Sequence, residues 1–240
     1  MTMALLEIST PDGMMEAFGA SPAGKPRGAV IVIQEAFGLT DHIGSIVDRL
    51  AAAGYRSVAP ALFHRSSRPA TVAGYDDYET VLPLMGELTA EGIETDLRAT
   101  VALLRGEGFG IEATGMVGFC MGGAVTLFAC TLGELAAGVT FYGGGVATGR
   151  FGLPSLIELA PHLTTAWLGL YGDLDESIPI DQVEALRAAA GDAGSATEIV
   201  RYADAGHGFN CNDRPAHYNA AAAADGWGRT IDFLGAHLQT

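Results

Sequence analysis

The sequence predicts an α/β protein with a mostly parallel sheet that is covered by helices on both faces. Short apolar runs rich in β-branched residues alternate with segments of helical periodicity along most of the chain. This alternation is typical of parallel strands that are connected by helices. Apolar residues make up 49% of the 240 residues, which is enough to bury a large core around such a sheet.

The predicted elements follow in order from residue 27. The run RGAVIVIQEAFG at 27–38 indicates a buried parallel strand. Residues 40–53 have helical spacing, with Thr40 as the N-cap and Gly54 directly after the helix. Further strands are expected at 55–60, 114–119, 135–144, 164–172 and 197–203, and further helices at 91–108, 120–132, 180–190 and 215–238.

The domain organisation is expected to be simple. No Gly/Ser linker, charge block or repeat divides the chain, so we expect residues 1–240 to form a single domain. Residues 61–88 are more polar and interrupt the alternation of strands and helices. We interpret this segment as a candidate cap or insert on the sheet.

The composition excludes several classes of partner. The chain carries 28 acidic and 13 basic residues, a formal net charge of −15. Nucleic acids and anionic membranes need a positive protein surface, so neither is expected as a partner. The chain shows no secretory pattern and no run of 18 apolar residues, and its three cysteines are too few for a disulfide framework. We therefore expect a cytoplasmic location, and we interpret the protein as a monomer.

The segment VGFCMGG at 117–123 places Cys120 in a tight turn between a predicted strand and a predicted helix. A strand that ends in G-x-nucleophile-x-G and opens a helix is the nucleophile elbow of many hydrolases. The flanking glycines, which leave room for the strained turn, are Gly118, Gly122 and Gly123. The helix N-terminus would stabilise a thiolate, and the Met121 N–H would face a developing oxyanion. The alternative is a buried structural cysteine in a turn that is tight for packing alone.

A nucleophile needs a base and an acid that orients the base, and such groups follow in the usual order. The strand at 168–179 runs into an acidic loop that offers Asp173, Asp175 and Glu176. The strand at 201–210 runs into a loop with His207 between two glycines. All these side chains would lie at the carboxyl ends of parallel strands, where ligands bind in open α/β sheets. The alternatives are a solvated acidic turn and a surface histidine.

The motifs GFCMGG, YGDLDESIP and GHGFN, together with IQEAFGL, resemble the dienelactone hydrolase family over about residues 5–238. This resemblance implies an α/β-hydrolase fold and a triad of Cys120, Asp175 and His207. Asp175 is preferred to Asp173 because the acid of the family lies four residues before a proline, here Pro179.

The resemblance also implies roles for the Gln-Glu-Ala segment that follows the first predicted strand. Glu35 would help to turn the resting thiol into a thiolate, and Ala36 would give the second oxyanion N–H. Taken by itself, Glu35 is a carboxylate at the mouth of a buried run, where a charge needs a purpose or a partner. An ordinary salt bridge is the alternative.

These features predict a cofactor-free hydrolase of small carboxylic esters or lactones, similar to carboxymethylenebutenolidase, that forms an acyl-thioester on Cys120. The alternative is a non-catalytic domain of the same fold that binds a small ligand or a partner in the same pocket. No metal is expected. His207, Cys211, Asp213 and His217 are residue types that can bind zinc, but they lack C-x-x-C or H-E-x-x-H spacing.

The candidate substrate-pocket residues are Phe37, Arg65, Arg68, Tyr142, Phe209 and Cys211. Family members that act on dienelactone bind its carboxylate through arginines in the cap and just after the histidine. Here Cys211 stands four residues after His207, and no Lys or Arg occurs between Arg68 and Arg98. Because a buried carboxylate needs a cation, we expect neutral substrates to be preferred.

Overall fold

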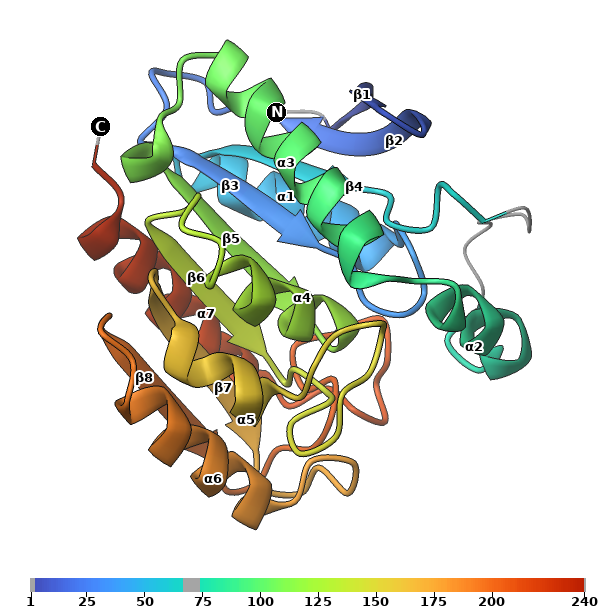
Figure 1. Ribbon diagram of the computed structural model, residues 1–240, viewed down its shortest axis with the longest axis vertical. Coiled ribbons are helices and arrows are strands. Elements are labelled where there is room, and N and C mark those ends of the chain that lie inside the picture. The colour runs from blue at the N-terminus through green and yellow to red at the C-terminus, as the bar shows by residue number, and fades with distance from the viewer. Residues whose placement is uncertain (1–2, 67–73, 240) are drawn as a thin grey trace.

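A computed structural model describes residues 3–66 and 74–239 (Figure 1). Its eight strands form one sheet with the order β1-β2-β4-β3-β5-β6-β7-β8. The strands are β1 (Ala4–Thr10), β2 (Gly13–Ala20), β3 (Ala29–Ile33), β4 (Arg56–Pro60), β5 (Thr114–Phe119), β6 (Ala137–Phe141), β7 (Ala166–Gly172) and β8 (Thr197–Tyr202). The six strands β3 to β8 pair in parallel. Strands β1 and β2 form an antiparallel hairpin, and β2 also pairs antiparallel with β4.

Helices cover both faces of the sheet, as the sequence predicts (Figure 1). They are α1 (Asp41–Ala52), α2 (Tyr78–Gly86), α3 (Ala90–Gly106), α4 (Met121–Ala129), α5 (Leu156–Leu159), α6 (Ile180–Gly191) and α7 (Ala220–His237). Buried side chains of α3 to α6 belong to one core cluster, and those of α1 and α7 belong to another. Within the described residues, none of these helices is long and apolar enough to cross a bilayer.

Strand β3 shows why its sequence is apolar throughout. All five residues, AVIVI, are buried, and alternate side chains enter opposite faces of the sheet. Ile31 and Ile33 join the core under α3 to α6, whereas Val30 and Val32 join the core under α1 and α7. A strand with helices on both faces therefore has no polar side.

Strand β3 ends earlier than the predicted run, and this difference shapes the site. The strand stops at Ile33, and Glu35 and Gly38 then close a tight loop through an isolated bridge. The loop carries Ala36 and Phe37 to the carboxyl end of the sheet. There Ala36 and Phe37 form a small apolar cluster with Val81 of α2.

Strands β1 and β2 and helices α2 and α5 were not predicted from the sequence. The hairpin of β1 and β2 precedes residue 27, and helix α2 lies inside the segment 61–88 that we interpret as a cap. Asp77 caps α2 by accepting a hydrogen bond from the Thr80 N–H at 3.1 Å. Figure 1 shows α2 standing apart from the helices that cover the sheet.

Candidate active site

Cys120 occupies a strained turn between β5 and α4. Its φ is 55° and its ψ is −114°, a conformation that residues other than glycine rarely adopt. The Cys120 N–H donates to the Phe141 carbonyl oxygen at 3.0 Å, and the Gly123 N–H donates to the Cys120 carbonyl oxygen at 3.0 Å. These bonds hold the thiol at the carboxyl edge of the sheet, directly before the N-terminus of α4.

The glycines around Cys120 are required by the space available. A Cβ at Gly122 would collide with the carbonyl groups of Ile33 and Gln34. A Cβ at Gly118 would collide with the carbonyl of Gly122, and a Cβ at Gly123 would lie 2.8 Å from the Gly143 Cα. Because the obstacles are backbone atoms, they cannot move aside cheaply.

The structure brings Cys120, His207 and Asp175 into one chain of hydrogen bonds. His207 Nε2 lies 3.0 Å from Cys120 Sγ, and His207 Nδ1 lies 2.7 Å from Asp175 Oδ2. The other oxygen of Asp175 accepts from the N–H and the hydroxyl of Ser177 at 2.9 and 2.6 Å. Ser177 is a supporting residue that the sequence did not point to.

The neighbouring carboxylate has a different partner. Asp173 accepts from Arg201 Nε and Nη2 at 2.7 and 2.8 Å, a two-point ion pair on the next strand. The structure thus places Asp175, and not Asp173, against His207.

Electrostatic interactions favour the charged forms of His207 and Asp175. Burial alone would lower the pKa of His207, but negative charge on Cys120 and the bond to Asp175 outweigh it and raise the pKa well above its ordinary value. Burial alone would raise the pKa of Asp175, but the hydrogen bonds from His207 and Ser177 hold it below its ordinary value. The surroundings therefore favour a positive charge on His207, with Asp175 ionised beside it.

Met121 and Ala36, whose N–H groups are expected to stabilise an oxyanion, lie in segments that follow neighbouring strands. Met121 is the first residue of α4, where an N–H has no acceptor within its helix. Ala36 lies in the tight loop that Glu35 and Gly38 close after β3. The loop and the helix start belong to neighbouring strands, β3 and β5, which pair in parallel.

Glu35 lies buried beside Tyr142 and does not form the alternative salt bridge to Arg or Lys within the described residues. Tyr142 Oη donates to Glu35 Oε1 at 3.4 Å. Burial, together with negative charge on Glu35, raises the pKa of Tyr142, so its hydroxyl keeps the proton. The ring centres of Tyr142 and His207 lie 5.2 Å apart. Tyr142 therefore contacts both Glu35 and the histidine that is hydrogen-bonded to Cys120.

The candidate pocket residues separate into two places. Tyr142 packs against Phe209 with ring centroids 5.1 Å apart, Phe37 lies under the cap, and the Cys211 thiol is buried 3.6 Å from Tyr75 Oη. Tyr142 also has a positive φ of 39°. Arg68 lies outside the described residues.

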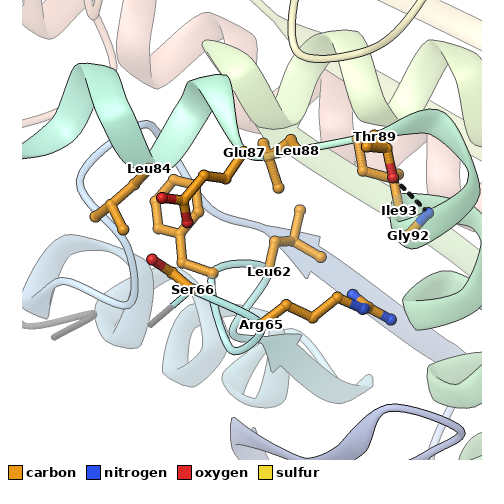
Figure 2. A pocket seen from close by; sticks show the side chains of 10 residues that line it. Leu62, Arg65, Ser66, Leu84, Glu87, Leu88, Thr89, Gly92 and Ile93 are labelled. Carbon is orange, nitrogen blue, oxygen red and sulfur yellow. Dashed lines mark hydrogen bonds between the residues drawn. The ribbon is translucent and has the colours of Figure 1, made fainter. Parts of the chain in front are cut away.

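Arg65 lies elsewhere. Its guanidinium pairs with both oxygens of Asp96 and with Asp12. Figure 2 shows Arg65 along a pocket with Leu62, Leu84 and Ile93, and neither Cys120 nor His207 lines that pocket.

Arg214 is a cation that lies beside the site. It lines a surface cleft of about 570 Å³ together with His207 and Asp175. Its guanidinium lies 5.4 Å from the Phe37 ring centre and 5.6 Å from that of Tyr75. It is seven residues after His207, not at the position four residues after it that Cys211 occupies.

The fold and this site define a class of protein, the hydrolases of α/β-hydrolase fold. Comparison with known proteins supports this class. The model of the dienelactone hydrolase family matches residues 15–238, and the chain belongs to this family.

A relative from Escherichia coli O157:H7 named "Putative carboxymethylenebutenolidase" is 37% identical over 225 residues, 92% of this chain and 82% of that protein. The carboxymethylenebutenolidase of Pseudomonas putida is 27% identical over 234 residues, 95% of this chain and 94% of that protein. The crystal structure of a "Putative Dienelactone Hydrolase" from Klebsiella pneumoniae is 33% identical, with a TM-score of 0.87 over 98% of this chain and 99% of that one.

Proposed function

We propose that this protein hydrolyses small carboxylic esters or lactones through nucleophilic attack by Cys120. The observation that carries the proposal is the unbroken contact from Cys120 Sγ through His207 to the Asp175 carboxylate, built on a strained elbow. The relatives named carboxymethylenebutenolidase support a lactone as one substrate.

The first half of the reaction forms an acyl-thioester. His207 takes the proton of Cys120, and the sulfur attacks the carbonyl carbon while the carbonyl electron pair moves onto oxygen. The N–H groups of Met121 and Ala36 stabilise that oxyanion. The intermediate then collapses, the carbon–oxygen bond to the leaving alkoxide breaks, and His207 returns the proton to the alkoxide. In a lactone, the released hydroxyl stays on the acyl chain.

The second half restores the thiol. Water gives a proton to His207 and attacks the thioester carbon, the carbon–sulfur bond breaks, and Cys120 leaves as a thiolate that is reprotonated. Asp175 keeps the imidazole in the tautomer that both halves need. Every proton and leaving group is handled by these side chains and water, so the reaction needs no cofactor.

We assign supporting roles to the surrounding groups. Glu35 helps to turn the resting thiol of Cys120 into a thiolate, and it acts through its contact with Tyr142. Phe37, Tyr142 and Phe209 provide an apolar surface for the acyl group. We propose a single domain over 1–240 with 61–88 as its cap, acting as a cytoplasmic monomer on neutral small molecules.

Kinetics of matched variants test the proposal. Cys120→Ala should remove turnover of every ester that the wild type cleaves, and Asp175→Asn should lower kcat by a factor on the order of 10³ or more. Asp173→Asn is the control, because its carboxylate pairs with Arg201 at the surface, and it should keep most of the activity. An active-site titration with an aryl ester should release about one equivalent of phenol in a burst. Binding without a burst or turnover would instead indicate the non-catalytic domain.

A further inference from the structure

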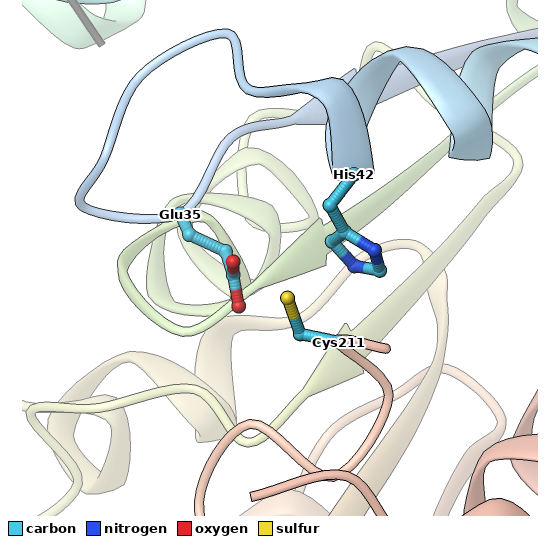
Figure 3. A group of neighbouring side chains, drawn as sticks. All are labelled: Glu35, His42 and Cys211. Atoms are coloured by element: carbon cyan, nitrogen blue, oxygen red, sulfur yellow. The ribbon is translucent and has the colours of Figure 1, made fainter. Parts of the chain in front are cut away.

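Three chemically different side chains converge beside the proposed active site. The proposed mechanism gives no role to the three of them acting together. They are Glu35 after β3, His42 in the first turn of α1 and Cys211 in the loop after β8. A carboxylate oxygen, an imidazole nitrogen and the sulfur all lie within 4.8 Å of one another. Figure 3 shows the three side chains pointing toward one another from separate elements. Their exposed fractions are 1%, 1% and 0%.

Three polar atoms of these side chains have no hydrogen-bond partner in the described part of the chain. Glu35 Oε2 and both ring nitrogens of His42 are buried without a hydrogen-bond partner among the described residues. A buried polar atom without a partner costs about 1–3 kcal/mol, and more when it is charged. The remaining contacts are long, 3.4 Å from Tyr142 to Glu35 and 3.6 Å from Cys211 to Tyr75. Lone pairs that converge without a donor are suited to a cation.

The ligand types agree with this interpretation. Neutral imidazole offers a lone pair on one ring nitrogen, and a metal ion that binds the Cys211 sulfur displaces the thiol proton.

We propose that Glu35, His42 and Cys211 form a binding site for one zinc ion, with water as the fourth ligand. Sulfur, imidazole nitrogen and carboxylate oxygen are the usual ligands of zinc, at about 2.0–2.3 Å. Ligand atoms around a tetrahedral ion then lie roughly 3.3–3.6 Å apart, so the widest spacing closes by about 1 Å. On binding, the zinc–sulfur bond forms and the Cys211 proton goes to solvent. The charges of zinc, Glu35 and the thiolate then sum to zero, which suits a buried site.

The Cys120 group has similar ligand types, but its atoms already satisfy one another. His207 uses both ring nitrogens on Cys120 and Asp175, and Asp175 accepts two further bonds from Ser177. A metal there would have to break these bonds, whereas Glu35, His42 and Cys211 have the long contacts to Tyr142 and Tyr75 and weaker interactions with Asn212 and Asp213.

Occupation of the site should inhibit the enzyme. Zinc would hold Glu35 away from Tyr142 and therefore from the resting thiol, and we expect turnover to fall as the site fills. This consequence depends on the proposed function, whereas the binding itself does not. The site is covered, so we expect binding to be slow.

The test uses Co²⁺ and Zn²⁺ as probes on the full chain carrying Cys120→Ala, which removes the competing thiol. We expect one Co²⁺ per chain, with a near-ultraviolet sulfur-to-cobalt charge-transfer band, and Zn²⁺ should displace it in competition with a chromophoric chelator. Adding Cys211→Ser should abolish the band, and adding His42→Phe should weaken Zn²⁺ binding at least tenfold. Adding Cys130→Ala is the matched control, because that thiol is buried in the core, and it should change neither readout.

Thermal melts establish that each variant is folded, and His42→Phe supplies the answer if Cys211→Ser does not fold. The proposal is overturned if Cys120→Ala gives no cobalt–thiolate band. It is equally overturned if the band and the zinc affinity persist in both added variants. Since no turnover is measured, failure of the proposed function would leave these results unchanged.

Discussion

The three cysteines have different surroundings, and this predicts different reactivity. Cys120 is partly exposed beside His207, which can accept its proton, whereas Cys130 and Cys211 are fully buried. Burial also raises the pKa of both buried thiols, that of Cys211 to about 11. We expect iodoacetamide at neutral pH to label Cys120 first, with one equivalent removing the activity. Peptide mass mapping checks the order. Faster labelling of Cys211 with activity retained would contradict it.

The charge of Cys120 and the carboxylate of Asp175 both raise the pKa of His207, although burial opposes them. Cys120→Ala removes one of the two raising groups, so we expect the pKa of His207 to fall in that variant. NMR titration of the His207 imidazole in the wild type and the variant checks this shift. An unchanged value would mean that Asp175 alone sets the pKa.

The same shift affects stability. A group whose pKa is raised on folding stabilises the protein fully below its unfolded pKa, about 6.5 for histidine, and loses that contribution as pH rises through the folded pKa. The free energy of unfolding of the wild type should therefore fall over that interval. Cys120→Ala should flatten this dependence, which urea denaturation across the pH range measures.

At the scale of single elements, two glycines in helices should respond oppositely to alanine. Gly122 in α4 faces the carbonyls of Ile33 and Gln34, so Gly122→Ala should destabilise the protein by about 1–3 kcal/mol or more. Gly228 in α7 has open space where a Cβ would be, so Gly228→Ala should stabilise it by about 0.5–1 kcal/mol. Urea denaturation of both variants measures the difference. A neutral Gly122→Ala would show that the elbow can relax.

The elements that the sequence predicts well are those whose pattern depends on local burial. Strand β3 and helix α4 are apolar because both sides are covered, so their runs are visible in the sequence. The hairpin of β1 and β2 escapes prediction because its residues alternate between buried and exposed without a strong apolar run. Helix α2 escapes it because it has only two buried residues, Val81 and Leu84, and contains Pro83.

The residues of the site also differ in how well the sequence predicts them. Cys120 and His207 are marked by glycines that the turns require, and the acid by its distance from Pro179. His42 carries no such motif, and it reaches Glu35 and Cys211 only because α1 buries the helix face that also holds Ile43, Ile46 and Leu50. The spacing of those apolar residues shows that His42 faces inward, but only the fold shows what it meets. Arg214 is hidden for the same reason, since a loop brings it back over Phe37.

For the whole molecule, charge decides which substrates approach. The chain has a formal net charge of −15, which slows anions, and Arg65 is occupied by Asp96 and Asp12. Arg214 opposes this tendency locally, because it lines the cleft of His207 and Asp175 and contacts aromatic rings instead of a carboxylate.

We therefore expect the enzyme to prefer a neutral lactone over the same lactone bearing a carboxylate. A missing charged hydrogen-bond partner costs about 1.5–3 kcal/mol, so the ratio of kcat/KM values should be roughly ten- to a hundredfold. The activity that remains toward the anion should depend on Arg214. Arg214→Ala should lower kcat/KM for the anion about tenfold and change the neutral lactone by less than about threefold, with Arg65→Ala as the control that alters neither. Paired kinetics on both lactones give the answer. A wild-type preference for the anion that disappears in Arg214→Ala would show that this one guanidinium overcomes the repulsion of the rest of the molecule.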